Sequence, residues 1–523
     1  MNRLAVLLEK ARTPMTGLAG VTALIGVFFV VRRVGLSLGA SKVVHEPLEG
    51  AAYLSMVAWR DGGWSAMYPT SYAAPGEPLV VTPYPPLFHA MWRWTSVLLG
   101  DGASYTPGRI VANGALLAIV ILIYACARRG GASRLLSALF SVIFLLPVPV
   151  ALWAGVARVD VPGIAFALAG LWLYLKYRED EQSYAYLTSA VPIVLAGFTK
   201  QSLVAVPAAI VLSELLARRF RRAALFAAAT AGPVLGGFVL LNWMTDGGFF
   251  DATVTSLADE FFFAAGLSVV VDFFVTNPLM LTLVLLTLSL MRFAERGDAV
   301  LVWFVATSCG VLALTIGKPG ANVNYFVEPI AALCMCGAVG LQRWQARRGW
   351  GAFVTTAVAF VVMWSVADLV PGYRAAYRSQ AATIARSEAI ALPPEALGGP
   401  VLVPASLTLL VEPRPEYYVN DSYTVGVVAA WGKLMTTDRI VDDLRHQRVG
   451  AVLVRPEEFR RREDGPNFIG DWQRGWNFWS IDEFREALLD AYAPVDRQYP
   501  LDVVLLLPKD SAGASARVPE PSP

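Results

Sequence analysis

Two carboxylates in a short polar stretch are the first residues of this chain that could do chemistry. Glu46 and Glu49 are three positions apart, so a helix places both on one face, and Tyr53 continues that stripe. A carboxylate held in this way can accept the proton of an incoming hydroxyl group, as a general base does. The helix dipole alone also favours an acid at a helix start, and this alternative explains one glutamate more readily than two.

A second pair of charges lies in an otherwise apolar turn. Arg158 and Asp160 are separated only by Val159, and apolar runs flank them on both sides. They can form an ion pair that holds the turn. They can also face a ligand, with Arg158 toward a phosphate and Asp160 toward a sugar hydroxyl or a proton. Charges at a membrane edge are treated as functional hypotheses, and we favour the ligand.

An isolated cation follows the next apolar run. Lys200 stands between Thr199 and Gln201, a set of side chains that suits a phosphate or diphosphate headgroup. The alternative is a lone lysine that only extends its amine to the membrane surface.

A glycine-rich segment carries a further cation, two amides and an aromatic ring. Within 317–326 we single out Lys318, Asn324 and Tyr325 as candidate ligand contacts. Amides and aromatic rings are what sugar or phosphate recognition requires. An ordinary loop with turn residues is the alternative.

The composition predicts that membrane-spanning helices position these residues. The chain has 523 residues, of which 56% are hydrophobic and only 16% are charged, and its mean hydropathy is +0.51. Soluble domains carry about 25% charged residues. A span needs roughly 20 mostly apolar residues, and a membrane β-barrel would show short alternating segments instead. We therefore expect a polytopic α-helical protein with about eleven spans, near 16–38, 109–127, 134–152, 161–176, 185–199, 202–217, 223–243, 267–291, 299–316, 326–342 and 351–370.

Lysine and arginine in the short loops predict the orientation. They gather in alternate loops, which we assign to the cytoplasm of a cell with this protein in its inner (plasma) membrane. The N-terminus is then cytoplasmic, and every candidate residue above falls on the outer face. The net charge of +2 gives no reason to expect a nucleic-acid partner. The four cysteines all lie in apolar runs, with no histidine spacing that would indicate a metal site.

The chain divides into a membrane part and a smaller outer part. Residues 1–370 contain the spans and a long first outside loop at 39–108. Short apolar runs at 401–403, 451–454 and 503–507 predict strands, and 438–447 and 481–492 predict amphipathic helices between them. We therefore expect an extracytoplasmic α/β domain over 371–508 and a disordered tail over 509–523.

Taken together, several of these segments resemble the GT-C superfamily of membrane glycosyltransferases. The resemblance covers roughly residues 1–370 and is nearest to the bacterial branch related to protein O-mannosyltransferases and to the aminoarabinose lipid A transferase. The segments that carry it are Glu49-Gly50-Ala51-Ala52-Tyr53, Tyr84-Pro85-Pro86-Leu87, Arg158-Val159-Asp160, Thr199-Lys200-Gln201 and Asn324-Tyr325-Phe326.

The resemblance implies roles for individual residues. Glu49 has the place of the family's general base, four residues before Tyr53, and Glu46 is a competing candidate. Some members carry a lysine just before the Pro-Leu element, where this chain has Tyr84; Lys200 can make that contact with the donor phosphate instead.

The resemblance also implies an activity. It is the inverting transfer of a hexosyl or pentosyl group from a polyprenyl-phosphate-linked donor to an extracytoplasmic glycan, lipid or protein. We expect no cofactor, because the first loop has no Asp-x-Asp motif of the kind that binds a divalent metal in some members.

A different class of protein, a transporter or flippase for a lipid-linked or acidic solute, is the alternative. Such a protein would place charges at the membrane midplane and show paired halves of similar hydropathy. Here the polar residues gather at one face instead.

Overall fold

We describe the fold from a computed structural model. The structure describes residues 2–510, with gaps at 44–46, 71–81, 181–182, 258–260, 294–298, 319–320, 322, 347–350, 388, 395, 397–398, 405–406, 408, 413–416, 421–437, 455–481, 496–498, 500 and 502.

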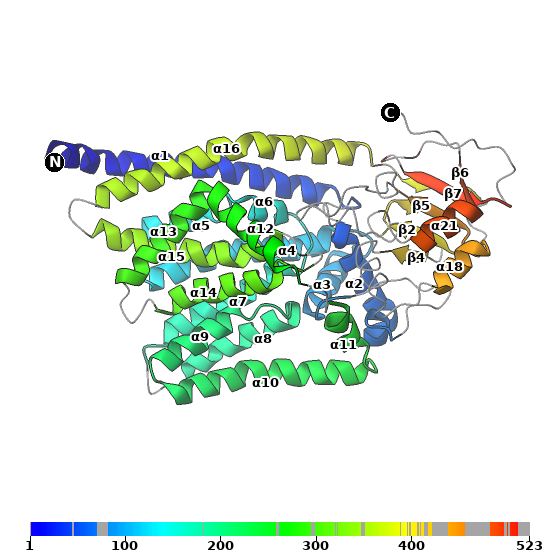
Figure 1. Ribbon diagram of the computed structural model, residues 1–523, viewed down its shortest axis with the longest axis horizontal. Coiled ribbons are helices and arrows are strands. Elements are labelled where there is room, and N and C mark those ends of the chain that lie inside the picture. Colours follow the sequence, from blue (N-terminus) through cyan, green and yellow to red (C-terminus); the bar gives the residue numbers. More distant parts are fainter. Residues whose placement is uncertain are drawn as a thin grey trace.

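Most of the chain forms a bundle of helices, with a small sheet beyond one end of it (Figure 1). Long apolar runs become helices because a helix satisfies its own backbone hydrogen bonds where lipid offers none. The helices are α1 (Asn2–Gly39), α2 (Pro47–Met67), α3 (Leu87–Leu99), α4 (Thr106–Arg129), α5 (Arg134–Ile143), α6 (Val148–Trp153), α7 (Asp160–Tyr177), α8 (Ala190–Thr199), α9 (Ala205–Leu216), α10 (Phe220–Met244), α11 (Gly248–Thr253), α12 (Phe263–Thr276), α13 (Pro278–Phe293), α14 (Ala299–Thr315), α15 (Val327–Gln345) and α16 (Gly351–Ala385), with 3₁₀ turns η1 (Ala185–Ser189), η2 (Thr255–Leu257) and η3 (Val323–Phe326).

The apolar helices identify a multi-pass membrane protein. Within the described ranges, five are long and apolar enough to cross a membrane, and six if the bent pair α12–α13 counts as one span. Large apolar side chains on the outer helices are exposed, as lipid-facing side chains are; Leu24 on α1 and Val239 on α10 are 59% and 71% exposed. Helix α15, in contrast, is 89% buried over its apolar window, so it forms the centre of the bundle.

Two of the expected spans are interrupted. The run expected at 134–152 forms α5 and α6, and the chain turns at Phe144–Pro147 between them. Proline has no backbone N–H group and interrupts a helix interior, which explains why α6 restarts at Pro147. The run expected at 267–291 forms α12 and α13, which meet at an angle of 92° beside Asn277 and Pro278.

The first loop forms helices of its own at the end of the bundle that faces the sheet (Figure 1). The segment that carries Glu49 is helical, as expected, and forms α2. An aromatic cluster of Tyr53, Phe88, Trp92 and Tyr105 packs α2 and α3 against α4. A methyl group at Gly108 would lie 2.4 Å from the Trp92 ring, so only glycine lets α4 approach that closely.

The small sheet contains the three expected strands. It has the order β4 (Tyr417–Asn420), β2 (Val401–Pro404), β5 (Ala451–Val454), β7 (Val504–Pro508) and β6 (Tyr492–Pro494). Strands β4, β2 and β5 pair in parallel, and β7 is antiparallel to both of its neighbours, β5 and β6. Helices α18 (Asp438–Arg445) and α21 (Asp482–Ala491) pack beside the sheet. A separate short pair joins β1 (Ile390–Ala391) to β3 (Val411–Glu412).

The sheet and the membrane part share a hydrophobic core. Leu402 and Val452 of the sheet belong to the same buried cluster as Tyr68, which follows α2, and Phe249 of α11. Tyr68 is completely buried and its ring contacts Phe249 edge-on, with 5.1 Å between the ring centroids. The sheet is thus packed against the loops at this end of the bundle.

Candidate active site

Asp160 is the centre of a buried polar cluster. Its Oδ1 accepts a hydrogen bond from Lys200 Nζ at 2.5 Å and another from Asn324 Nδ2 at 2.7 Å. Its Oδ2 accepts a hydrogen bond from Trp153 Nε1 at 3.3 Å. These partners come from α6, from the turn after α8 and from η3, and Asp160 itself begins α7. Segments far apart in the sequence therefore converge on one carboxylate, which is 1% exposed.

Two glycines of α7 bring Asp160 and Lys200 together. A methyl group at Gly163 would lie 2.3 Å from Leu203 Cδ1, and one at Gly170 would lie 2.4 Å from Ile193. Real Cβ atoms essentially never come closer than 3.0 Å to another atom, so a larger residue at either position would require α7, α8 or the side chains between them to shift. The close packing of these helices holds the carboxylate within reach of the amine.

Arg158 and two tyrosines complete the surroundings of Lys200. Arg158 Nη2 donates to the Tyr84 hydroxyl at 3.2 Å, and Arg158 Nε lies 3.7 Å from Asp160 Oδ2. Lys200 Nζ lies 4.2 Å from the centroid of the Tyr325 ring and 6.0 Å from that of Tyr84. Aromatic faces attract cations, most strongly where water is excluded. The site therefore holds two cations, one central carboxylate and two aromatic rings.

The environment keeps Lys200 charged and Tyr84 neutral. Burial lowers the pKa of Lys200, but the Asp160 carboxylate, together with Tyr325 and Tyr84, outweighs burial and raises that pKa above its ordinary value. Burial raises the pKa of the Tyr84 hydroxyl, although Arg158 and Lys200 oppose that shift. The site thus presents a permanent ammonium group beside a neutral phenol.

Gln201 supports the site without lining it. Its Nε2 donates to the carbonyls of Pro83 at 2.9 Å and Thr253 at 3.0 Å. It thereby joins the segment before Tyr84 to the end of α11. Gln201 was predicted as a contact for the donor phosphate, and the structure gives its amide a role in holding the loops around the site.

Glu49 lies in a different buried ion pair. Its carboxylate accepts hydrogen bonds from Arg109 Nε and Nη2, both at 2.7 Å, and neither side chain is exposed. Arg109 also donates to the carbonyls of Ser37 and Ala40 through Nη1, and to that of Val43 through Nη2. The pair joins α2 to α4 and to the end of α1.

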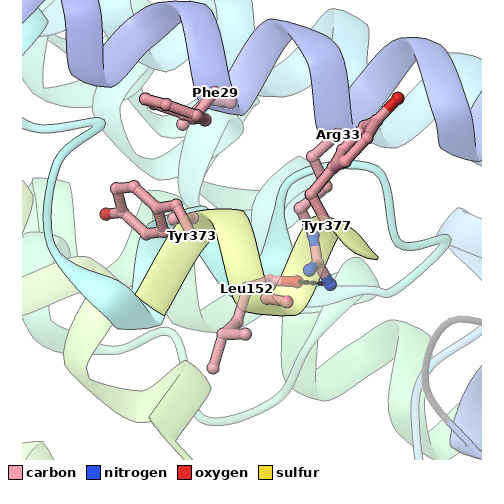
Figure 2. A pocket seen from close by; sticks show the side chains of 8 residues that line it. Phe29, Arg33, Leu152, Tyr373 and Tyr377 are labelled. Carbon is pink, nitrogen blue, oxygen red and sulfur yellow. Dashed lines mark hydrogen bonds between the residues drawn. The ribbon is translucent and has the colours of Figure 1, made fainter. Parts of the chain in front are cut away.

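The Glu49 pair reaches the Asp160 cluster through the backbone. Glu49 Oε1 also accepts the N–H of Ala157, next to Arg158, at 2.8 Å. The same turn is held from α1: Arg33 donates to the carbonyl of Leu152 at 3.1 Å (Figure 2) and to that of Ala154 at 3.2 Å. Glu49 and Arg33 therefore fix the backbone that carries Arg158.

The remaining predicted residues lie elsewhere. Tyr53 packs on Trp92 and Tyr105 and donates to the carbonyl of Gly102 at 3.2 Å. Lys318 lies 3.5 Å from the carbonyl of Leu257, and Glu46 falls outside the described residues. The structure thus brings Tyr84, Arg158, Asp160, Lys200, Asn324 and Tyr325 together, with Gln201 beside them, and leaves Glu49, Tyr53 and Lys318 apart.

A small cavity of about 20 Å³ opens beside Asp160 and Lys200. It has room for about one water-sized group. Its lining includes Asn324, Tyr325 and a glutamate that sequence reasoning missed, Glu328 in the first turn of α15. Arg109 was missed as well. The sequence does indicate that Glu328 and Arg109 are unusual, because each is a lone ionisable side chain inside or at the edge of an apolar run.

Over the described ranges, no group of three or more His, Cys, Asp or Glu side chains could hold a metal ion. Two cations, Lys200 and Arg158, lie beside Asp160, and cations of this kind bind anions such as phosphate through charge-assisted hydrogen bonds.

Known proteins share this fold. ArnT from Cupriavidus metallidurans, an aminoarabinose lipid A transferase, superposes with a TM-score of 0.59 in its apo state and bound to undecaprenyl phosphate, at 14% identity over 94% of this chain and 99% of that one. The apo oligosaccharyltransferase of Archaeoglobus fulgidus superposes with a TM-score of 0.52, at 12% identity over 95% of this chain and 76% of that one. No protein-family model and no curated protein matches the sequence.

The architecture is therefore that of a polytopic membrane protein with a helical bundle and a small sheet at one end. More specifically, it is the fold of the GT-C glycosyltransferases, as the sequence resemblance predicted. At these identities the likeness establishes the fold, and the chemistry has to be argued from the residues of this chain.

Proposed function

We propose that this protein is a membrane glycosyltransferase that takes a hexosyl or pentosyl group from a polyprenyl-phosphate donor and passes it, with inversion, to an extracytoplasmic acceptor. One observation carries the proposal: Lys200 and Arg158 lie buried beside Asp160, at the end of the bundle where the first-loop helices and the sheet meet. The shared fold with ArnT bound to undecaprenyl phosphate supports a lipid-phosphate ligand.

The two cations suit the phosphate of such a donor. Lys200 and Arg158 are each about 4% exposed, so water does not screen them. A phosphodiester oxygen accepts hydrogen bonds from ammonium and guanidinium groups, and charge-assisted bonds of this kind are about twice as strong as neutral ones. Tyr84 adds a neutral hydroxyl donor beside them. These groups would also offset the charge that develops on the phosphate as it leaves.

Asp160 is the acid best placed to act as the base. In the described structure Lys200 and Asn324 share one of its carboxylate oxygens. A phosphate arriving at Lys200 and Arg158 would compete with Asp160 for both cations. Asp160 would then be a stronger base, because it would lose part of the positive charge that stabilises its ionised form. The donor itself would thus prepare the carboxylate to take the proton of the acceptor hydroxyl.

Glu49 remains a candidate base from the sequence resemblance, but its geometry supports a positioning role. Both its oxygens already bind Arg109, and Oε1 also binds the Ala157 amide. A proton acceptor has to come within about 3 Å of the hydroxyl that it deprotonates. Moving Glu49 there would leave the buried Arg109 guanidinium without its anionic partner, which is costly. We therefore assign proton transfer to Asp160 and loop positioning to Glu49.

The displacement needs little acid catalysis. The polyprenyl phosphate leaves as an already stable anion, so the bond between the anomeric carbon and the phosphate oxygen can break without protonation. The acceptor oxygen forms the new bond from the opposite face of the sugar, and its proton passes to Asp160. A single displacement of this kind inverts the anomeric configuration.

Sugar transfer by purified protein tests the proposal. Protein in lipid nanodiscs is given radiolabelled undecaprenyl-phosphate sugars together with cell-envelope extract as the acceptor source, and label in glycan, lipid and protein fractions is counted. Transfer by the wild type and its loss in Asp160→Asn support the proposal. Movement of intact labelled donor across the bilayer of liposomes, with no transfer, would contradict it and favour the flippase alternative.

A further inference from the structure

We infer that Glu328 and Asn324 form a subsite that reads a hydrogen-bond donor, a hydroxyl or an amine, on the sugar of the lipid-linked donor. The inference rests on the proposed function and deepens it. It names the residues that would distinguish one sugar from another, whereas Lys200 and Arg158 would bind the phosphate that all such donors share.

The first observation is an unused acceptor on each side chain. Oε1 of Glu328 and Oδ1 of Asn324 are buried, and neither has a hydrogen-bond partner in the part of the chain that the structure describes. The residues are 6% and 5% exposed. A buried acceptor without a partner costs about 1–3 kcal/mol, so native proteins rarely leave one unused unless a ligand or water completes it. Two such acceptors on one cavity point to a partner that donates hydrogen bonds.

The second observation is where these acceptors lie. Both residues line the cavity that also contains Asp160 and Lys200. Asn324 donates an N–H of its amide to Asp160, through Nδ2 at 2.7 Å, whereas its carbonyl oxygen accepts no hydrogen bond from any described residue. A sugar joined to a phosphate at Lys200 would therefore carry its hydroxyl or amino groups toward Glu328 and Asn324.

The helix dipole explains only part of this arrangement. Glu328 is the acid in the first turn of α15, and an anion is favoured at a helix N-terminus. An acid that only capped the helix would accept hydrogen bonds from its free N–H groups or face water. Oε1 of Glu328 does neither, because it is buried and accepts no bond from any described residue. Its hydrogen-bonding capacity is thus left for the cavity.

Binding measurements separate the sugar from the phosphate. Full-length protein in nanodiscs is titrated with undecaprenyl phosphate and with two undecaprenyl-phosphate pentoses, one bearing only hydroxyls and one with an amine in place of a hydroxyl. We expect Glu328→Leu to weaken binding of at least one sugar-bearing lipid by about 10–100-fold, the loss expected when a buried hydrogen bond is removed, and to leave binding of undecaprenyl phosphate unchanged. The sugar lipid whose affinity falls more shows whether the group that donates a hydrogen bond to Glu328 is a hydroxyl or an amine.

A deoxy-sugar donor adds a sharper test. If Glu328 reads one hydroxyl, removing that hydroxyl from the sugar weakens wild-type binding but has little further effect in Glu328→Leu, because the two changes remove the same interaction. Asn324→Leu should show the same pattern if it shares the contact. Glu214→Gln is the matched control: Glu214 is also a buried glutamate, and its Oε2 has no hydrogen-bond partner among the described residues, but it does not line the cavity and its Oε1 accepts from the Tyr174 hydroxyl at 2.7 Å. It should bind every lipid as the wild type does.

The outcomes are distinct. Equal loss of undecaprenyl phosphate and of the sugar lipids in Glu328→Leu would overturn the inference, since Glu328 would then shape the phosphate site. Unchanged binding of every lipid would overturn it too, and would assign the cavity to a bound water. A wild-type protein that binds none of these lipids would contradict the proposed function itself, and the subsite falls with it.

Discussion

Arg109 holds Glu49 through two hydrogen bonds of 2.7 Å, one to each carboxylate oxygen, with both side chains completely buried. The carboxylate that sequence resemblance places first as the general base is thus already bound. The Asp160 carboxylate, 1% exposed and beside two cations, lines the cavity instead. The structure therefore separates an acid that holds the loops from an acid that lines a cavity.

Replacing each acid by its amide tests this separation. We expect Asp160→Asn to lower sugar transfer by about 10²–10⁴-fold, the usual contribution of a general base. Glu49→Gln should lower the thermal unfolding midpoint, with a smaller loss of transfer per folded molecule. Transfer is measured at equal amounts of folded protein, judged by size-exclusion chromatography. An inactive Glu49→Gln protein with wild-type stability, next to an active Asp160→Asn, would restore the assignment of the base to Glu49.

Removing either cation should weaken binding of the lipid phosphate. Lys200→Ala and Arg158→Ala each remove a charge-assisted hydrogen bond, so we expect undecaprenyl phosphate to bind about 10–100-fold more weakly. Lys200→Arg should retain part of the affinity. Arg93→Ala is the control, because Arg93 lies 4.8 Å from the Trp59 ring in the first loop and away from the cavity. If both alanine variants bind undecaprenyl phosphate as tightly as the wild type, Lys200 and Arg158 have only a structural role.

The Arg109 pair should be a major source of stability. Arg109→Met removes the guanidinium group that binds a buried carboxylate and three carbonyls, and breaking such an ion pair costs about 3–5 kcal/mol. The variant should unfold at a clearly lower temperature in detergent. Adding Glu49→Leu should recover part of the loss, since no unpaired charge then remains. A double variant as unstable as the sum of the two single variants would show that the pair is not coupled.

His89 should make the first loop sensitive to acid. Burial, with a smaller contribution from Arg158, lowers the pKa of His89 to about 3, from an ordinary value near 6.5. Below pH 6.5 the unfolded chain binds a proton that the folded chain does not, so stability is complete above that pH and is lost as the pH falls toward 3. Between pH 7 and pH 5 the loss is about 2 kcal/mol.

The His89→Gln variant isolates this effect, because glutamine keeps a polar side chain but does not titrate. Its thermal unfolding midpoint in detergent should fall less than that of the wild type between pH 7 and pH 5. Equal falls in both proteins would assign the acid sensitivity to other groups.

The sequence predicts much of the fold because long apolar runs and strand-length runs are local patterns. The helices near 109–127, 223–243 and 351–370 and the strands at 401–404, 451–454 and 504–508 follow from such patterns. The breaks at Pro147 and beside Pro278 escape detection, because the apolar run continues through each of them. The composition of a segment shows that it is apolar, but it does not show where the helix axis changes direction.

The sequence indicates several residues of the candidate site, but it does not show which side chains pair with one another. Arg158, Asp160, Lys200 and Asn324 are recognisable as polar residues at the ends of apolar runs, and the structure joins them. The partner of Glu49 is Arg109, which is 60 residues away, and no local pattern shows such a contact. Distant partners are set by packing, including the close contact of Gly108 with Trp92.

The right-angled junction of α12 and α13 has a consequence for the surrounding bilayer. The helices have 14 and 16 residues. At about 1.5 Å per residue they are about 21 and 24 Å long, shorter than the hydrocarbon layer of about 30 Å. Leu281, Leu285 and Leu288 of α13 are 43–57% exposed, so this short wall is apolar. The bilayer beside this wall must become thinner, or its lipids must tilt, to match the length of the helix. This costs fractions of a kcal/mol per Å of mismatch. We therefore expect the bilayer to be thinner beside α13 than along the longer helices on the other sides of this protein.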